Sequence, residues 1–410
     1  MIHEREDNKQ EGEEEDEDAQ ECRMILPALK PPDQKVSVWK VIKDAVGKDL
    51  SRFCVPVYFN EPISMLQKVS EIMEYEQLLV NACRPENAQN SIKRILYVSS
   101  FAIAQYKCSD HRTNKPFNPI LGETFEFLTP QFKYFSEQVC HHPPISACYA
   151  NSDCYEFWMN TNMKTQFWGK SLEVKPLGYQ HVRLHVPMPD GSKKVEHYIV
   201  ERVSSSVNNL IFGEMYVEHT GVMTVKNLSN GDTCQVEFKK RGWSGKGAYE
   251  VEGSAFNAAN PSVKQAKIWG KWTETLTIQF QGQPEELIWT ANPLPPQSAS
   301  MYHFTYFTLQ LNFLPPQLVS KLPPTDSRLR PDQRALECGD LVKASDEKAR
   351  LEDKQRKMRK ERETQGREYQ SKYFEEYFDE ESGEKGYRYG IRDYWQDRSK
   401  GEFSHLEDIF

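Results

Sequence analysis

The sequence predicts a mainly β fold of the α+β class: a near-closed antiparallel β-barrel with an N-terminal lid and helices and a C-terminal helical or irregular region. The first observation is a hydrophobic period of two from about residue 118 to residue 313, which is typical of half-buried strands. The second is an aromatic content of 12%, which suits strands around an apolar interior. The third is the length of this stretch, because so long a sheet must curl, split or close, and closure removes exposed edges.

Turn signals indicate how neighbouring strands pair within this sheet. Asn230-Gly231 lies between the apolar runs 222–225 and 234–238, and an Asn-Gly pair in that setting predicts a β-hairpin. Pro189-Asp190-Gly191 predicts a second turn, because its residues favour tight changes of chain direction. A barrel of more than about eight strands is wider than its side chains can fill, so we expect an interior that holds a ligand.

Helical patterns precede the sheet. A short amphipathic helix that ends at Gly47 is predicted by apolar residues at helical spacing, namely Val38, Trp39, Ile42, Ala45 and Val46. This helix is too short to be stable alone, so it either packs on the core or forms a lid over a cavity that also touches a bilayer. The same spacing predicts two core-packing helices at 62–83 and 89–107.

The two ends of the chain have a different composition from the middle. Residues 331–365 read as helical, open with Pro331-Asp332 and are dense in Lys, Arg and Glu, whereas 369–410 show no clear period. The run 11–18 is almost wholly acidic and cannot bury enough apolar surface to order itself. We therefore expect a disordered acidic arm at 1–34 and one domain at 35–410, comprising a lid (35–60), helices (61–110), a β-barrel (111–313) and a C-terminal helical region (314–410).

Composition excludes several classes of protein. The net charge of −8 argues against a nucleic-acid partner, since such proteins are usually basic. The nine cysteines have no Cys-x-x-Cys spacing, which argues against a zinc module and a disulfide framework and favours reduced thiols in the cytoplasm. No apolar run reaches the length of a membrane-spanning helix, and the acidic start is unlike a signal peptide. We expect a cytoplasmic protein that contacts membranes only peripherally.

The most informative segment is Glu137-Gln-Val-Cys-His-His-Pro-Pro144. Random order would give His-His-Pro-Pro in only about one such chain in a thousand, so the motif needs an explanation. Pro143 fixes its own φ and biases His142 toward an extended conformation. Because neighbours in an extended segment point to opposite faces, both imidazoles reach one ligand only if the chain turns there or the ligand is large.

Three interpretations of the histidine pair stay open on the residues alone. The imidazoles can donate to a phosphate, which would raise their pKa and strengthen the interaction. They can be structural. They can bind a metal or act as general bases, although no Asp, Glu or Cys stands at the usual ligand spacing, and Ser136 and Ser146 have no distinguishing context as nucleophiles.

Segment 137–144 resembles the signature of the oxysterol-binding protein family, whose usual form has Ser where this chain has Cys140. Further blocks that resemble this family follow in the expected order from about Val36 to the end: Lys115-Pro-Phe-Asn-Pro-Ile-Leu-Gly-Glu123, Phe167-Trp-Gly-Lys-Ser171, Gly270-Lys-Trp272 and Pro323-Pro-Thr-Asp-Ser-Arg-Leu-Arg-Pro-Asp332, which leads into Lys348, Glu352 and Arg356. The closest likeness is to the short members with a bare lipid-binding domain. We expect the small substitution at Cys140 to be tolerated.

The resemblance implies a lipid carrier with no cofactor. Its ligands would be a sterol or another membrane lipid and phosphatidylinositol 4-phosphate, bound in one barrel pocket and exchanged between membranes. Carried over by position, the phosphoinositide contacts are Lys115, Asn118, His141, His142, Lys348, Glu352 and Arg356, and the lid residues are Trp39 and Ile42. The spacing of i, i+4 and i+8 places the last three phosphoinositide residues on one helix face.

Two other functions compete with lipid exchange. The first is a lipid-sensing scaffold that binds phosphoinositide or sterol without net transfer. The second is a hydrolase, which the absence of a Gly-x-Ser-x-Gly elbow from the sequence argues against. Residues 15–21 are faintly like an acidic motif that binds an endoplasmic reticulum receptor, but Asp16 and Glu17 stand where such motifs need aromatic residues, so a solvated tail is the alternative.

Overall fold

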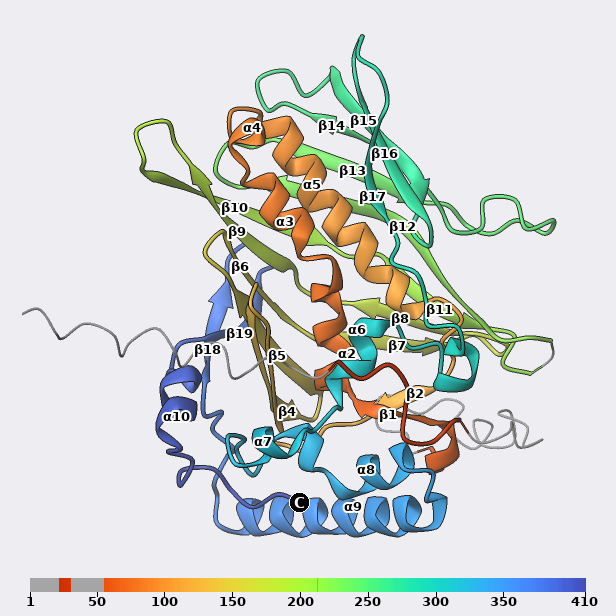
Figure 1. The fold of residues 1–410 in the computed structure, drawn as a ribbon, viewed down its shortest axis with the longest axis vertical. Helices are drawn as coiled ribbons and strands as arrows, with labels where there is room; N and C mark the ends of the chain where they lie inside the picture. Colours follow the sequence, from red (N-terminus) through yellow and green to blue (C-terminus); the bar gives the residue numbers. More distant parts are fainter. Residues whose placement is uncertain (1–21, 31–54, 212) are drawn as a thin grey trace, which may run out of the picture.

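Figure 1 shows the fold, which comes from a computed structural model that describes residues 22–30, 55–211 and 213–410. The predicted lid helix, with Trp39 and Ile42, lies outside these residues, as does the acidic run at 11–18. One large sheet of 15 strands dominates the described chain. Its strands are β3 (Thr124–Leu128), β4 (Lys133–His141), β5 (Pro144–Asn151), β6 (Tyr155–Asn160), β7 (Met163–Phe167), β8 (Leu172–Pro176), β9 (Gln180–Pro187), β10 (Lys193–Glu201), β11 (Ser204–Asn208), β12 (Tyr216–Asn227), β13 (Thr233–Phe238), β14 (Glu250–Phe256), β15 (Lys264–Lys271), β16 (Thr275–Phe280) and β17 (Glu286–Thr290).

The sheet is antiparallel and strongly curved, and the mainly β fold class is confirmed. Its main path runs β17-β16-β15-β14-β13-β12-β10-β9-β6-β5-β4-β3, while β7, β8 and β11 branch from β12. Over the described residues β3 and β17 do not pair with each other, so the barrel is near-closed rather than strictly closed. The hairpin around Asn230-Gly231 joins β12 to β13, and the turn at Pro189-Asp190-Gly191 joins β9 to β10, as the turn signals predict.

Short helices and two small sheets complete the domain. The small sheets pair β1 (Asn60–Ser64) with β2 (Lys115–Phe117) and β18 (Phe374–Asp379) with β19 (Glu384–Tyr389). The α-helices are α2 (Met65–Ser70), α3 (Gln77–Ala82), α4 (Pro85–Ala88), α5 (Ser91–Ala104), α6 (Tyr306–Leu311), α7 (Pro316–Val319), α8 (Pro331–Glu337), α9 (Leu341–Thr364) and α10 (Tyr394–Lys400). The 3₁₀ turns are η3 (Val57–Phe59), η4 (Glu71–Tyr75), η5 (Gln105–Ser109), η6 (Ser298–Met301) and η7 (Ser327–Leu329). None of the helices in the described ranges has the length and apolar character needed to cross a membrane.

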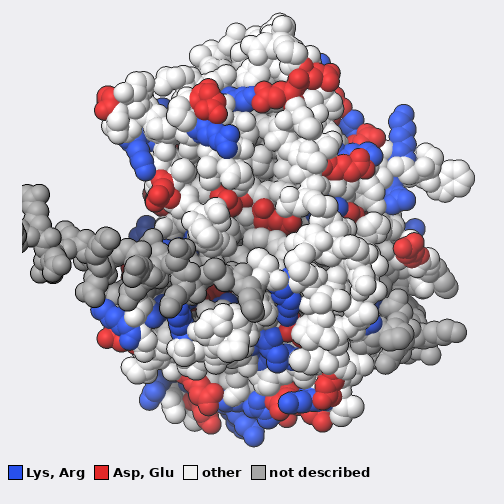
Figure 2. All heavy atoms as spheres, viewed as in Figure 1, with Lys and Arg blue, Asp and Glu red and all other residues white. Residues whose placement is uncertain are grey.

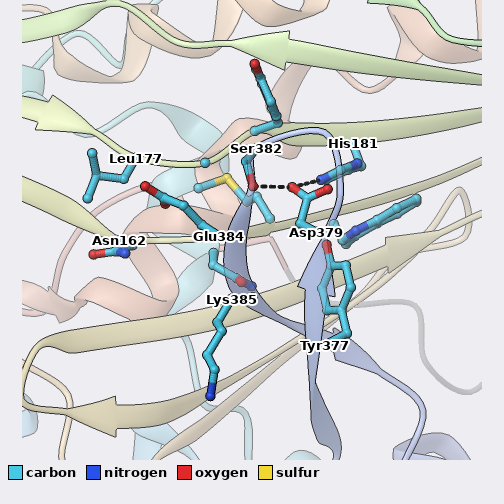
Figure 3. Close-up of a pocket in the computed structure, with 14 residues that line it drawn as sticks. Asn162, Leu177, His181, Tyr377, Asp379, Ser382, Glu384 and Lys385 are labelled. Carbon is cyan, nitrogen blue, oxygen red and sulfur yellow. Dashed lines mark hydrogen bonds and ion pairs between the residues drawn. The ribbon is translucent and has the colours of Figure 1, made fainter.

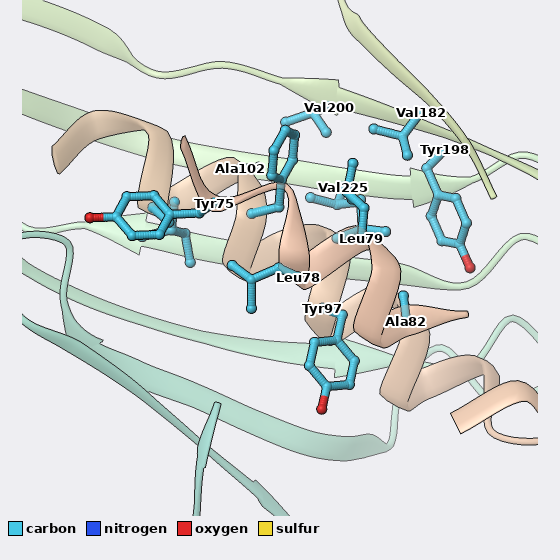
Figure 4. Close-up of a cluster of buried hydrophobic side chains, with 14 of the residues drawn as sticks. Tyr75, Leu78, Leu79, Ala82, Tyr97, Ala102, Val182, Tyr198, Val200 and Val225 are labelled. Carbon is cyan, nitrogen blue, oxygen red and sulfur yellow. The ribbon is translucent and has the colours of Figure 1, made fainter. Parts of the chain in front are cut away.

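The core lies between the curved sheet and the helices α3 and α5. Figure 4 shows Leu79 and Ala102 from these helices facing Val182, Val200 and Val225 of the sheet. Helix α5 is buried along nearly its whole length, as expected for a helix that is apolar on most sides. The predicted helices at 62–83 and 89–107 both exist, but the first divides into α2, η4 and α3.

The C-terminal region differs from its prediction in two places. The single helix expected at 331–365 is two helices, α8 and α9, because Gly339 adopts a φ of +80° that ends the first. The stretch without clear periodicity contains the β18–β19 hairpin and α10. Asn160 holds this hairpin, since its side chain donates to the Tyr387 carbonyl (2.9 Å) and accepts from the Tyr387 N–H (2.7 Å).

The prediction of a disordered arm at 1–34 does not hold for residues 22–30. Arg23 forms an ion pair with Glu337 (2.7 Å), and its backbone N–H donates to Gln310 Oε1 (2.8 Å). Leu26 is only 3% exposed and packs with Ile63 and neighbouring aromatic rings. The composition argument failed here because it averaged an apolar stretch, 24–29, with the acidic run before it.

Candidate functional site

A cavity of about 300 Å³ lies between the β1–β2 pair, the β4–β5 turn and helix α9. All seven predicted phosphoinositide residues line it, although they come from three distant parts of the chain. The complete lining is Val55, Asn60, Lys115, Asn118, Ile120, His141, His142, Arg330, Lys348, Leu351, Glu352, Gln355, Arg356 and Arg359. The lining contains five cationic side chains and one carboxylate, so the cavity is suited to an anionic group.

Lys115 and Asn118 are positioned by the short parallel pairing of β1 with β2. Asn60 pairs with Lys115 in this register, and its side chain also donates to the Lys115 carbonyl (2.9 Å). The ammonium of Lys115 donates to Asn118 Oδ1, so the two side chains predicted to meet a headgroup already contact each other. An ammonium and an amide side by side offer donors and an acceptor to a phosphate and its neighbouring hydroxyls.

The histidine pair stands at the turn between β4 and β5, where β4 ends at His141 and β5 begins at Pro144. The chain therefore turns at this point, and both imidazoles line the same cavity, with ring centroids 4.5 Å apart. A β-bulge interrupts the pairing of β4 with β5 between Gln138 and Cys140. Such an extra residue shifts the alternation of a strand and redirects the side chains that follow.

Helix α9 supplies the far wall of the cavity. Lys348, Glu352 and Arg356 all face the cavity, as their spacing predicts. The ammonium of Lys348 donates to the Val55 carbonyl, and Arg356 forms an exposed ion pair with Asp353. Figure 2 shows Lys and Arg gathered, with acidic side chains among them, along the edge where Figure 1 draws α9.

Arg330 is a lining residue that sequence reasoning missed. Its side chain is 4% exposed and forms ion pairs with Glu123 (2.9 Å) and Asp332 (2.8 Å). It also donates to the Asn118 carbonyl (2.8 Å), so it fixes the backbone that presents Asn118 to the cavity. Although burial lowers the pKa of Arg330, the Asp332 and Glu123 carboxylates hold that pKa above its ordinary value.

The metal and catalytic interpretations of the histidine pair gain no support from the geometry. Ser136 donates to the Phe125 carbonyl and Ser146 donates to Gln138 Oε1, so both hydroxyls already have partners other than the histidines. Over the described ranges, no group of three or more His, Cys, Asp and Glu side chains is placed to hold a metal ion. The roles assigned to the seven residues stay predictions.

Glu137, in the same motif as the histidines, has a structural role. Its carboxylate accepts from the backbone N–H groups of Lys372 (2.8 Å) and Tyr373 (3.0 Å) and from the Tyr369 hydroxyl (2.9 Å). Burial raises the pKa of Glu137 to about 7, although these three donors act in the opposite direction. Strand β4 therefore ends in the histidine pair and, four residues earlier, anchors the segment that follows α9.

Replacing Glu137 with Ala is expected to lower the free energy of unfolding by about 2–4 kcal/mol, because three donors lose their buried acceptor. Hydrogen exchange of residues 369–389 should accelerate more than exchange of the sheet. Glu156→Ala is the matched control, since its carboxylate makes only partly exposed pairs at 3.4 Å with Arg183 and His185. Equal exchange in the two variants would contradict the anchoring role.

A second cavity, of about 20 Å³, lies under the β18–β19 hairpin. Figure 3 shows Asp379 and Ser382 facing His181 across it. His181 lies 3.5 Å from Asp379 and 3.1 Å from His197, and burial lowers the pKa of both histidines to about 4. Neutral imidazoles in so small a space fasten the hairpin to β9 and β10 rather than bind a ligand.

Comparison with known sequences gives a consistent result. A family model described as "Oxysterol-binding protein" matches residues 37–399. The chain is 40% identical over 356 residues to human oxysterol-binding protein-related protein 3, and it is 39% identical over 398 residues to Arabidopsis thaliana oxysterol-binding protein-related protein 1B. The alignments cover 86% and 95% of this chain, but 39% of the human protein and 76% of the plant protein.

Two solved structures share the fold. The Osh1 ORD domain in complex with cholesterol superimposes with a TM-score of 0.86 at 34% identity, covering 96% of this chain and 95% of that one. The Osh3 ORD in complex with PI(4)P, from Saccharomyces cerevisiae, gives a TM-score of 0.79 at 33% identity, covering 95% of this chain and 99% of that one. Both are structures of the same kind of domain with lipids of different classes.

Proposed function

The chain belongs to the oxysterol-binding protein family, and from this premise we propose that it is a lipid-transfer protein. It would bind a sterol or another membrane lipid and, in the same pocket, phosphatidylinositol 4-phosphate, and would exchange the two between membranes. The protein would work in the cytoplasm, peripherally at membranes or membrane contact sites, and would perform no catalytic step. Its ligands would be lipids, with no cofactor.

The observation that supports this function most strongly is the convergence of the seven predicted residues on one cavity. The imidazoles of His141 and His142 would donate to the phosphates, and Lys115, Lys348 and Arg356 would supply compensating charge. Asn118 and Glu352 would hydrogen-bond the inositol hydroxyls. Glu352 stands between two cations on the same helix face, so it would also hold them in place.

The two structural relatives support a pair of ligands. One was solved with cholesterol and the other with PI(4)P, so this kind of domain accommodates both chemistries. If the two lipids exclude each other from one pocket, each membrane encounter replaces one by the other, which makes exchange directional. The hydrophobic gain of hiding a sterol or acyl chains from water would drive uptake.

Native mass spectrometry of the protein after incubation with liposomes that contain both a sterol and phosphatidylinositol 4-phosphate tests the shared pocket. We expect one lipid of either kind per protein and never both. Phosphoinositide without any sterol would keep the headgroup site and point to another second lipid, phosphatidylserine first. The absence of any bound lipid would contradict the proposal and favour a scaffold.

A lipid-sensing scaffold that binds without net transfer is the second proposal, since a headgroup cavity serves both functions. Transfer between two liposome populations separates them, because a carrier turns over many lipids per protein and a sensor stops near one. The lid residues Trp39 and Ile42 and an endoplasmic reticulum receptor for the acidic arm also stay predictions, since residues 1–21 and 31–54 lie outside the described chain.

A further inference from the structure

The loop between β13 and β14, residues 239–249, carries the most exposed large apolar side chain of the described chain. Trp243 has an exposed fraction of 107%, which means that no other part of the described protein covers its indole. Lys240, Arg241 and Lys246 surround it and are also exposed. Large apolar side chains that are wholly exposed often mark a surface that meets a partner.

A hydrogen-bonded turn fixes Trp243 at the tip of this loop. The N–H of Gly242 donates to the Lys246 carbonyl (2.8 Å), and the N–H of Gly245 donates to the Gly242 carbonyl (2.9 Å). Gly247 has a φ of +81°, and a Cβ there would stand 3.0 Å from the Lys240 carbonyl oxygen, so the two arms of the loop approach closely. The exposure of the indole is therefore a property of an ordered structure.

The positive charges at the tip differ from the one at the base of the loop. Lys239, at the base, pairs with Glu252 (2.8 Å) and Glu250 (3.7 Å). Over the described ranges, Lys240, Arg241 and Lys246 form no ion pair, and the guanidinium of Arg241 lies over the Tyr216 ring at 5.1 Å. A basic tip on a chain with a net charge of −8 is a local feature that favours an anionic partner.

A second tryptophan lies at the same end of the sheet. Trp168, in the β7–β8 turn, is 59% exposed and stands two residues from the exposed Lys170. The Lys170 carbonyl accepts from the Leu210 N–H, just beyond β11, and β11 pairs with the first residues of β12, where Tyr216 lies under Arg241. The two tryptophans thus stand on neighbouring turns of one sheet end.

We propose that this tryptophan surface (Trp168, Lys170, Lys240, Arg241, Trp243 and Lys246) docks the protein onto an anionic membrane, with the indole of Trp243 at headgroup depth. The inference rests on the proposed function, because a lipid carrier must meet bilayers, and it names the surface that does so. An indole prefers the boundary between headgroups and acyl chains, and nearby Lys and Arg add attraction to anionic lipids. The tip projects outward (Figures 1 and 2), so it suits a fluid bilayer better than a shaped protein pocket.

Flotation of the full chain with vesicles tests the docking. The vesicles consist of phosphatidylcholine with or without phosphatidylserine, and they contain neither sterol nor phosphoinositide, so the lipid pocket is not involved. Trp243→Ala is expected to reduce binding to the anionic vesicles about tenfold, as expected for removing an interfacial anchor. Lys240→Gln with Lys246→Gln should reduce it roughly fivefold per lysine, and high salt should have the same direction of effect.

The matched control lies at the β9–β10 turn, which Figure 1 draws on the opposite side of the molecule. Val195 is 52% exposed there, and Val195→Ala with Lys193→Gln should leave vesicle binding unchanged. Binding by Trp243→Ala equal to wild type, or binding indifferent to phosphatidylserine, would overturn the docking surface. If the wild type docks through Trp243 but never takes up lipid, the docking surface stands and the proposed function fails. Lipid uptake by the wild type together with unaltered vesicle binding by Trp243→Ala would mean that the proposed function stands and the docking surface fails.

Discussion

Replacing His141 and His142 together with Ala should abolish extraction of phosphatidylinositol 4-phosphate from liposomes while leaving the fold intact. Each imidazole would make a hydrogen bond to a charged phosphate, and such bonds contribute about 1.5–3 kcal/mol each. Losing two of them should weaken headgroup binding by a factor of at least about 100, since each 1.4 kcal/mol is a tenfold change. Both side chains stand in a turn at the cavity wall, so their truncation removes little of the core.

The measurement is phosphoinositide extraction, with circular dichroism and thermal unfolding of each variant as the test of folding. His185→Ala is the matched control, because His185 lies on β9 and contacts Glu156 at 3.4 Å, away from the cavity lining. Sterol uptake by the double variant should persist if the histidines contact only the headgroup. Extraction equal to wild type would refute the role assigned to the pair.

The largest effect on stability should come from Arg330→Ala. Removing this guanidinium leaves the buried carboxylates of Glu123 and Asp332 without their cation, and breaking a buried ion pair in this way costs about 3–5 kcal/mol. The Asn118 carbonyl loses a donor at the same time, so headgroup binding should weaken beyond the loss of one positive charge. Chemical denaturation measures the first effect, and phosphoinositide binding well below the unfolding transition measures the second.

Arg350→Ala is the control for this prediction. Arg350 lies on α9, is about half exposed and pairs with Glu347, so its loss should cost no more than about 1 kcal/mol. Arg330→Lys separates charge from geometry, because an ammonium keeps the charge but cannot bond two carboxylates and the Asn118 carbonyl in the same planar arrangement. Equal stability of Arg330→Ala and Arg350→Ala would show that the buried network is dispensable.

The sequence was informative about the site where a local rule applied. Helical spacing alone placed Lys348, Glu352 and Arg356 on one face, and the structure confirms that they share it. The histidine pair stood out by its improbability, but the turn that brings both rings to one cavity could not be derived from the strand pattern. The gathering of these residues with Lys115 and Asn118 came from the family resemblance, because no local pattern spans such separations.

Other residues could not be found from the sequence for identifiable reasons. The partner of Arg330, Glu123, lies 207 residues away in the chain, so nothing near Arg330 announces a buried ion pair. Arg359 stands three residues after Arg356 on the same helix, so its spacing could have revealed it. The β18–β19 hairpin was missed because contacts from Asn160 and His181 on the main sheet hold it, although Ser382-Gly383 between aromatic runs was a usable turn signal.

The walls of the headgroup cavity come from opposite ends of the chain, and this affects how the protein is made. Lys115 and Arg356 are separated by 241 positions (356 − 115), yet both line the cavity. At a synthesis rate of about 5–20 residues per second, the ribosome needs roughly 12–50 seconds to extend the chain from the first wall to the last. The sheet can begin to form during that interval, but the anion site cannot exist until α9 has emerged. A nascent chain is therefore unable to capture a phosphoinositide by its headgroup, and the first loading follows completion of synthesis.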